Sequence, residues 1–148
     1  MKTILAIDPG TTHSAYVLYG NGIIFDHGWI SNQDMRQVLI GIEYDAVAIE
    51  MIASYGMAVG ASTFETCVWI GRFIEVARVD VELIFRKDIK LFLCGTMRAK
   101  DANIRQALID LIGPQGTKAQ PGPTYGIKSH SWAALAVAVF AANNNKRK

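Results

Sequence analysis

Two carboxylate residues each follow a short apolar run. Asp8 ends the run Ile4-Leu5-Ala6-Ile7 and precedes the turn-forming pair Pro9-Gly10, and Glu50 ends a similar run over 46–49. Apolar runs of this length are typical of strands buried on both faces of a sheet. A carboxylate at such a strand end is costly to bury unless it meets a cation or a hydrogen-bond donor. Each acid is therefore either a structural residue at a strand end or an oxygen ligand for a hard metal ion.

The elements between the two acids allow them to meet. Gly20-Asn21-Gly22 separates strand-like runs over 14–19 and 23–29, which predicts a β-hairpin. Apolar residues then recur at helical spacing over 32–43, with Ser31 as the expected cap. A helix supplies the crossover that a parallel strand pair needs. If the first and fourth strands are parallel neighbours, both carboxylates lie at one edge of the sheet.

The rest of the chain predicts one helix, one short strand and then three consecutive helices. In order, the sequence predicts a helix over 63–78, a strand over 81–85, helices over 88–93 and 99–112, a long mobile Gly- and Pro-rich loop over 113–126, and a tightly packed small-residue helix over 129–142. The element order is βββαβαβααα. We expect one domain over residues 1–142 and a frayed basic tail over 143–148.

Composition allows one sizeable core and excludes several protein classes. The chain has 148 residues, of which 51% are hydrophobic, and a net charge of +2, which permits nucleic acid as a partner without requiring it. Its two cysteines, Cys67 and Cys94, form no CxxC pair, so the sequence indicates neither a zinc site nor a disulfide framework. The apolar run over 132–142 is shorter than the ~20 residues that span a bilayer. We therefore expect a soluble cytoplasmic protein without membrane contact.

Three segments together resemble the RuvC family of Holliday junction resolvases, and most closely its phage-type members. Leu5-Ala6-Ile7-Asp8-Pro9-Gly10 resembles the family's opening strand with its first catalytic acid, and Val47-Ala48-Ile49-Glu50 resembles the second acid. The third segment runs from Asp88-Ile89-Lys90 through Gly95 to Ala99-Lys100-Asp101-Ala102-Asn103-Ile104 and is similar to the family's lysine pattern. This resemblance implies an α/β, ribonuclease H-like fold, with a five-stranded mixed sheet flanked by helices and forming a single RuvC-like nuclease domain.

The resemblance also implies a crossover junction endodeoxyribonuclease, which resolves Holliday junctions in branched DNA by paired symmetric nicks. This chemistry would use two Mg²⁺ ions per active site, with Mn²⁺ as an alternative. Asp8 would bridge both ions and Glu50 would bind one of them. In the last helix the family carries two acids three residues apart, where this chain has His130 and Ala133. His130 is therefore the third expected ligand, whereas an alanine can ligate nothing.

Ala133 leaves two interpretations open. In the first, Asp8, Glu50 and His130 suffice for catalysis, and water or Asp101 completes the shell of the second ion. In the second, the site is weakened or inactive, and the protein binds junctions without cutting them.

The resemblance further implies a set of DNA contacts and a two-fold dimer. Basic residues near the scissile phosphate position the substrate, and an aromatic or apolar residue after the second acid stacks on the opened junction. Because a four-way junction has near two-fold symmetry, two active sites call for a homodimer, and the helix over 63–78, with Trp69 and Phe73, is the expected interface. The expected DNA contacts are Thr11, Tyr55, Met57, Lys90, Arg98 and Lys100, with Lys100 also expected to act in catalysis.

Two other families share single features with this sequence. Asp8-Pro9-Gly10-Thr11-Thr12 also resembles the phosphate loop of actin-like kinases, but those proteins need two such domains, for which 148 residues are too few. YqgF-like nucleases have a similar length and act on RNA, but they lack the lysine pattern and the long loop over 113–126.

Overall fold

A computed structural model of the chain describes residues 2–147, and its elements follow the expected order. The strands are β1 (Ile4–Asp8), β2 (His13–Gly20), β3 (Ile23–Ser31), β4 (Ala46–Met51) and β5 (Val81–Phe85), and the helices are α1 (Asn32–Gly41), α2 (Ala61–Val76), α3 (Arg86–Cys94), α4 (Asp101–Ile112) and α5 (His130–Arg147).

The strands form one mixed sheet in the order β3-β2-β1-β4-β5. β1 is antiparallel to β2 and parallel to β4, with Ile7 opposite Ile49. Asp8 and Glu50 are the next residues on these two strands, so both acids lie at the same edge of the sheet, as expected. The β2–β3 hairpin turns through Asn21 and Gly22, whose φ angles of 52° and 78° are those of a type I′ turn.

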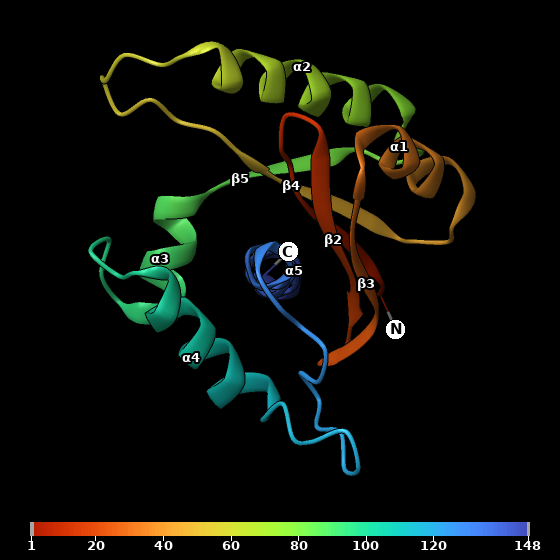
Figure 1. The fold of residues 1–148 in the computed structure, drawn as a ribbon, viewed down its shortest axis with the longest axis vertical. Coiled ribbons are helices and arrows are strands. Elements are labelled where there is room, and N and C mark those ends of the chain that lie inside the picture. Colours follow the sequence, from red (N-terminus) through yellow and green to blue (C-terminus); the bar gives the residue numbers. More distant parts are fainter. Residues whose placement is uncertain (1, 148) are drawn as a thin grey trace.

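Helices cover both faces of the sheet, and a hydrophobic core fills each side (Figure 1). Side chains of β1 alternate between the two cores: Leu5 and Ile7 pack in the core under α1 and α2, whereas Ile4 and Ala6 pack in the core that includes α5. This double burial explains why β1 has no polar residue before Asp8.

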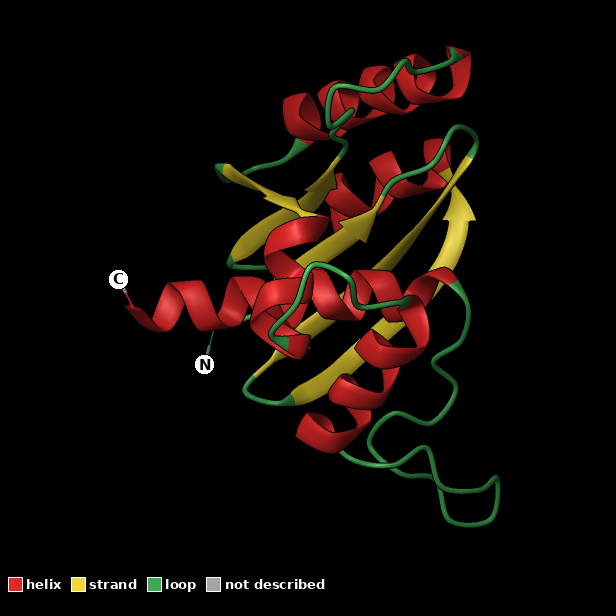
Figure 2. Ribbon diagram, turned by 90° about the vertical axis from the view of Figure 1, so that its left-hand side faces the viewer, coloured by secondary structure: helices red, strands yellow, loops and turns green. Residues whose placement is uncertain are grey.

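Helix α5 runs between the sheet on one side and α3 and α4 on the other (Figures 1 and 2). Every residue from Ala134 to Val139 is buried, and three of these six are alanines, which allow close packing on all sides. The predicted tight packing of this helix is confirmed. Its end is not: α5 continues through Arg147 instead of stopping at Ala142, so the expected frayed tail forms helical turns, apart from Lys148, which lies outside the described residues.

Two further expectations need correction. Phe73, expected on an interface, is fully buried in the core under α1 and α2, because the inward face of α2 carries Thr66, Ile70 and Phe73. The loop over 113–126 projects from the body of the protein (Figure 2), but it is not simply mobile. Its end is fixed by hydrogen bonds, including that from the buried Thr124 hydroxyl to the Gly113 carbonyl at 2.9 Å.

Among residues 2–147, none of the helices combines the length and the apolar composition that crossing a bilayer requires.

Candidate active site

Asp8, Glu50 and His130 converge at the carboxyl edge of the central parallel strands. Asp8 ends β1, Glu50 is the last residue but one of the adjacent β4, and His130 begins α5, which packs across the same strands. The Nδ1 atom of His130 lies 3.4 Å from the Oδ2 atom of Asp8. The side chains of Asp8 and Glu50 are 14% and 18% exposed, and that of His130 is 64% exposed. The two carboxylates are therefore largely buried, whereas the imidazole beside Asp8 is exposed to solvent.

Burial makes both carboxylates harder to ionise. It raises the pKa of Asp8, against the lowering effect of the nearby His130 and Arg86 charges. Burial, and then repulsion from Asp8, raises the pKa of Glu50 from 4.5 to about 7, against the lowering effect of Arg86. The Asp8 charge thus opposes the ionisation of Glu50, and a bound cation would relieve this repulsion.

Arg86 and Asp101 complete the cluster of charges. The first residue of α3, Arg86, directly follows β5, and its Nη1 atom lies 3.3 Å from the Oε1 atom of Glu50. Its other terminal nitrogen, Nη2, forms an ion pair with Asp101, the first residue of α4. The guanidinium therefore links the end of β4 to the start of α4. The sequence suggested Asp101 only as a possible ligand of the second ion and did not indicate its pairing with Arg86.

A buried polar network fixes the loop that follows Asp8. The Ser14 hydroxyl donates to Oδ1 of Asn32 at 2.6 Å, and Nδ2 of Asn32 donates to the Gly10 carbonyl at 2.9 Å. The Gly10 N–H in turn donates to Ser14 Oγ at 3.3 Å. A Cβ at position 10 would lie 2.4 Å from the His13 carbonyl oxygen, so this close approach requires glycine. The network ties the loop to the start of α1.

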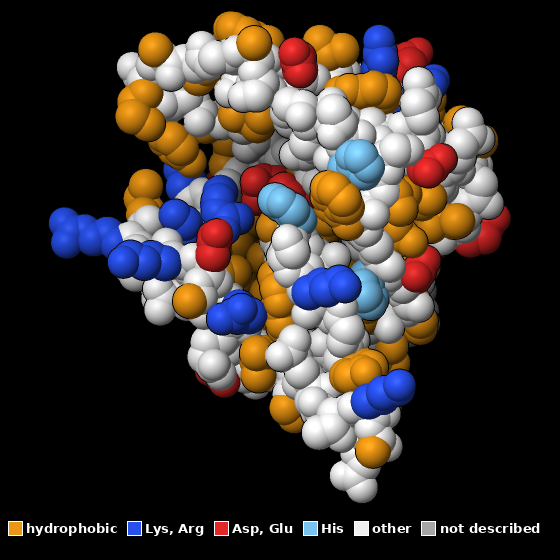
Figure 3. All heavy atoms as spheres, viewed as in Figure 1, with side chains coloured by type: hydrophobic (Ala, Val, Ile, Leu, Met, Phe, Trp, Pro, Cys, Tyr) orange, Lys and Arg blue, Asp and Glu red, His pale blue; other side chains and the backbone are white. Residues whose placement is uncertain are grey.

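The expected DNA-contacting residues lie on three segments around the acids. Arg86 and Lys90 share one face of α3, and Lys100 directly precedes α4, beside the paired Asp101. Figure 3 shows Lys and Arg side chains gathered over α3 and α4, next to recessed acidic side chains and a histidine. Arg98 lies exposed between these helices, and Thr11 lines a hollow with Asp8 and His130.

Tyr55 and Met57 lie on the exposed loop between β4 and α2. The Met57 N–H donates to the Ser54 carbonyl at 3.0 Å, and Tyr55 and Gly56 have φ angles of 52° and 79°, so Tyr55 lies at the tip of a tight turn. Both side chains are exposed, at 57% and 71%. Their contact with DNA stays a prediction.

Two aromatic rings next to His130 were not identified from the sequence. Trp29 stacks on His13 with ring centroids 4.3 Å apart, and the exposed Trp29 lines two hollows that His130 also lines. The pairing register of the β2–β3 hairpin aligns these residues diagonally, with His13 opposite Ser31 and Trp29 opposite Ala15. Only the cross-strand register, which the sequence leaves undetermined, brings the two rings together.

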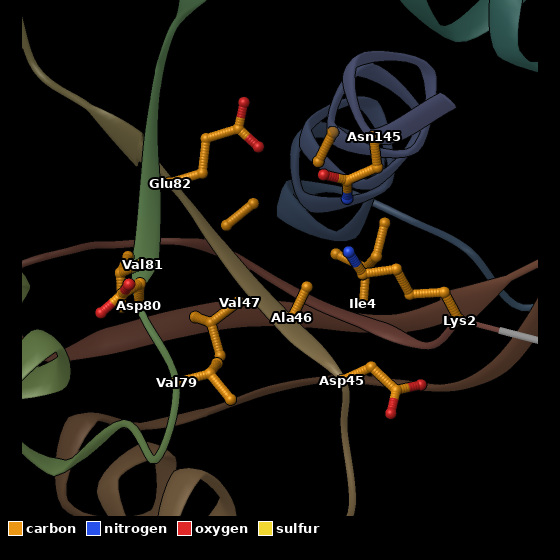
Figure 4. Close-up of a pocket in the computed structure, with 12 residues that line it drawn as sticks. Lys2, Ile4, Asp45, Ala46, Val47, Val79, Asp80, Val81, Glu82 and Asn145 are labelled. Carbon is orange, nitrogen blue, oxygen red and sulfur yellow. The ribbon is translucent and has the colours of Figure 1, made fainter. Parts of the chain in front are cut away.

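A separate hollow, of about 380 Å³, lies away from His130, at the opposite edge of the parallel strands (Figure 4). Two of the three acids that line it already have partners: Asp45 accepts from the Thr3 N–H at 2.8 Å, and Glu82 accepts from the Asn144 amide at 2.9 Å. Ligands of open α/β sheets bind at the carboxyl ends of the strands, where Asp8 and Glu50 lie. The carboxyl edge is therefore the better candidate for a reactive site.

Within the described part of the chain, no group of three or more His, Cys, Asp or Glu side chains is arranged so that it could hold a metal ion. The three expected ligands are gathered at one edge, but Glu50 is paired with Arg86, and His130 is paired with Asp8. Asp8, Glu50 and His130 therefore stay candidate ligands, and binding an ion would require their side chains to rearrange.

Comparison with solved structures identifies the fold. The chain matches Thermus thermophilus RuvC with a TM-score of 0.73 and 18% identity, over 98% of this chain and 96% of that chain. It also matches T. thermophilus RuvC in complex with Holliday junction substrate, with a TM-score of 0.67 and 18% identity, over 97% of each chain. Neither a family model nor a curated protein sequence matches the chain. The fold is thus RuvC-like, and the expected ribonuclease H-like architecture is confirmed.

Proposed function

We propose that this protein is a divalent-metal-dependent endonuclease that resolves four-way DNA junctions. The observation that carries the proposal is the convergence of Asp8, Glu50 and His130 at the open edge of a RuvC-like sheet. The solved structure of T. thermophilus RuvC with its Holliday junction substrate supports branched DNA as the substrate class.

The donor set suits Mg²⁺ or Mn²⁺. Carboxylate oxygens are hard ligands that both ions accept, and Mn²⁺ also accepts imidazole. A divalent cation between Asp8 and Glu50 would offset the burial that raises the pKa of both groups and the repulsion from Asp8 that further raises the pKa of Glu50. Asp8, Glu50 and His130 would hold this ion. When bound, the ion would activate water and polarise the phosphodiester.

The residues of the chain itself bind and orient the substrate. Phosphates would bind the Lys and Arg side chains of α3 and α4, including Lys90 and Lys100. Hydrolysis joins a water oxygen to phosphorus and breaks one P–O ester bond; the water proton passes to solvent, and the departing oxygen takes up a proton. In this scheme Asp8 and Glu50 must be ionised, so the pKa of about 7 for Glu50 makes the metal-free site sensitive to pH near neutrality.

A homodimer would supply two active sites for the two strands of a junction. Helix α2 presents an exposed stripe of Phe64, Val68 and Gly71, which lie on one face at helical spacing. A Cβ added to Gly71 would have no described atom within 4 Å, although glycine in a helix interior costs about 1 kcal/mol relative to alanine. An apolar stripe that ends in a glycine fits the close approach of a second α2 helix. We place the interface on this stripe, and not on Phe73.

Junction binding without cleavage is the second candidate function. Two observations favour it: Ala133 offers no ligand next to His130, and Glu50 is held by Arg86. A third possibility is an RNA-directed nuclease of the YqgF-like kind. It differs from the other two in its substrate, which would be RNA instead of a DNA junction.

The deciding experiment incubates the protein with a synthetic four-way DNA junction and with Mg²⁺ or Mn²⁺. Paired nicks at symmetric positions, lost in Asp8→Asn and in EDTA, support the resolvase. A shifted band without nicks supports the binding protein, and faster cleavage of a matched RNA substrate supports the RNA nuclease. Equal cleavage of linear duplex DNA would contradict selectivity for junctions.

A further inference from the structure

Arg86 is a fixed positive charge inside the acidic cluster. Its side chain is 29% exposed and lies between Glu50 and Asp101, which come from different elements. An arginine at a helix start commonly extends into solvent, whereas this one is held in place from both sides. Such a pre-organised guanidinium loses little conformational freedom when it binds a further anion.

The guanidinium keeps hydrogen-bonding capacity for a ligand. Arginine has five N–H donors in a planar fork, and the contacts to Glu50 and Asp101 each use one terminal nitrogen. In the described structure, the remaining donors are available to a group that enters from the solvent side. The fork matches the geometry of two oxygens of one phosphate group.

A cavity of about 320 Å³ gives such a group access to Arg86. The cavity lies between the start of α4 and the first turn of α5, and Arg86, Asp101, His130 and Ala133 all line it. Because position 133 is an alanine, this wall contributes no carboxylate that could help to hold a cation. Asp101, the remaining acid of the cavity, is already paired with Arg86.

The charges in the cluster balance with one divalent cation. Asp8, Glu50 and Asp101 together carry one more negative charge than a divalent ion offsets, and Arg86 supplies the difference. A second divalent ion would need the carboxylate of Asp101, which is already paired with the guanidinium through its Oδ1 atom.

We propose that each active site binds one divalent cation and that Arg86, instead of a second metal ion, contacts the phosphodiester. This inference rests on the proposed nuclease function. Arg86 donates hydrogen bonds to non-bridging phosphate oxygens and offsets the negative charge that develops on them as water attacks phosphorus. It remains protonated throughout, so it neither gives nor takes a proton in the hydrolysis.

The first test counts ions and needs neither DNA nor a variant. Titrating the wild-type protein with Mn²⁺, with the free ion followed by electron paramagnetic resonance, is expected to show one strong site per chain. Two strong sites per chain would overturn the inference, whatever the nicking activity. Asp8→Asn, which removes a proposed ligand, should abolish the strong site.

The second test exchanges Arg86 for a metal ligand. Ala133→Asp alone should still bind one Mn²⁺ per chain, because the new carboxylate pairs with Arg86 across the cavity. Combining Arg86→Ala with Ala133→Asp should give two strong sites per chain. If the double variant also binds one ion, the inferred exchange between Arg86 and a metal ion is wrong.

The third test uses the DNA. Arg86→Ala should lower the junction-nicking rate by about 10²–10³-fold, and in EDTA it should reduce the salt dependence of junction binding by about one phosphate contact. Lys146→Ala removes a charge roughly 24 Å along α5 from His130 and should change neither quantity. Arg86→Ala that nicks like the wild type would overturn the inference, whereas a wild-type protein that binds one ion and never nicks would instead overturn the proposed function.

Discussion

Glu50 illustrates how the fold sets the chemistry of a single residue. Its strand, β4, is buried between two cores, and its end places the carboxyl group beside Asp8. Burial and then the Asp8 charge raise its pKa from 4.5 to about 7, although Arg86 acts in the opposite direction. In the metal-free protein, ionising Glu50 therefore costs more free energy in the folded state than in the unfolded state.

This shift predicts the pH dependence of folding in EDTA. Between about pH 4.5 and pH 7 the folded state holds a proton that the unfolded state has released, so the free energy of unfolding falls as pH rises through this window. The fall attributable to Glu50 is at most about 3 kcal/mol. Glu50→Gln should remove this part of the slope in urea unfolding measured at about pH 5 and about pH 8.

Glu43→Gln, which alters an exposed carboxyl group beyond α1, is the matched control and should keep the wild-type slope. Added Mg²⁺ should raise the melting temperature more at the higher pH, because the ion binds the ionised carboxylates. A Glu50→Gln variant with an unchanged slope would show that Glu50 ionises normally in the folded protein.

At the same scale, sequence patterns found the acids but not their partners. Asp8 and Glu50 were recognisable because each ends an apolar run, a local pattern. Arg86 lies 36 residues from Glu50 and 15 from Asp101, and only the packing of α3 and α4 brings the three together. No local signal marks such a pairing, so Arg86 appeared in the sequence as one of several basic residues.

At the scale of elements, the position of Asp8 depends on how its loop is joined to α1. Ser14 and Asn32 are almost fully buried, and their hydrogen bonds to each other and to Gly10 hold the loop after β1 against the start of the helix. The cap of the same helix, in which Ser31 Oγ accepts from the Asp34 N–H at 3.1 Å, was predicted from the sequence and is confirmed. The cap is local, whereas the network joins residues far apart in the chain.

Ser14→Ala should therefore act on both stability and activity. It leaves the buried oxygen of Asn32 without its hydroxyl donor, which should lower the free energy of unfolding by about 1–3 kcal/mol, and it frees the Gly10 backbone that orients Asp8. We expect slower junction nicking with junction affinity largely kept. Urea unfolding and single-turnover nicking measure the two effects.

Ser31→Ala provides the comparison, because it removes a hydrogen bond from the same helix without touching the loop. It should cost about 1 kcal/mol and leave the nicking rate of the folded protein unchanged. If both variants slow nicking equally, stability of α1 and not the loop network controls the position of Asp8.

At the scale of the whole molecule, the element order and sheet followed from the sequence, but the outer face of α2 did not. This helix carries apolar residues around most of its surface, so its periodicity alone did not distinguish inward from outward positions. Packing against the sheet and α1 assigns Ile70 and Phe73 to the core and leaves Phe64 and Val68 exposed, at 61% and 55%. Only the position of the neighbouring elements separates a core face from an interface.

The exposed stripe predicts how the two active sites are coupled. Phe64→Glu or Val68→Glu should convert a wild-type dimer to a monomer in sedimentation equilibrium, because the charge would be buried against its own copy at a two-fold axis. On a plasmid carrying an extruded cruciform, the dimer should make two nicks before release and yield linear DNA. The monomer should make one nick and yield open circles, since a single site cannot reach both strands.

Leu111→Glu on α4, where the leucine is 59% exposed, introduces the same charge away from the stripe and should leave dimer and product unchanged. A wild-type monomer, or a Phe64→Glu variant that still yields linear DNA, would place the coupling of the two nicks elsewhere on the molecule.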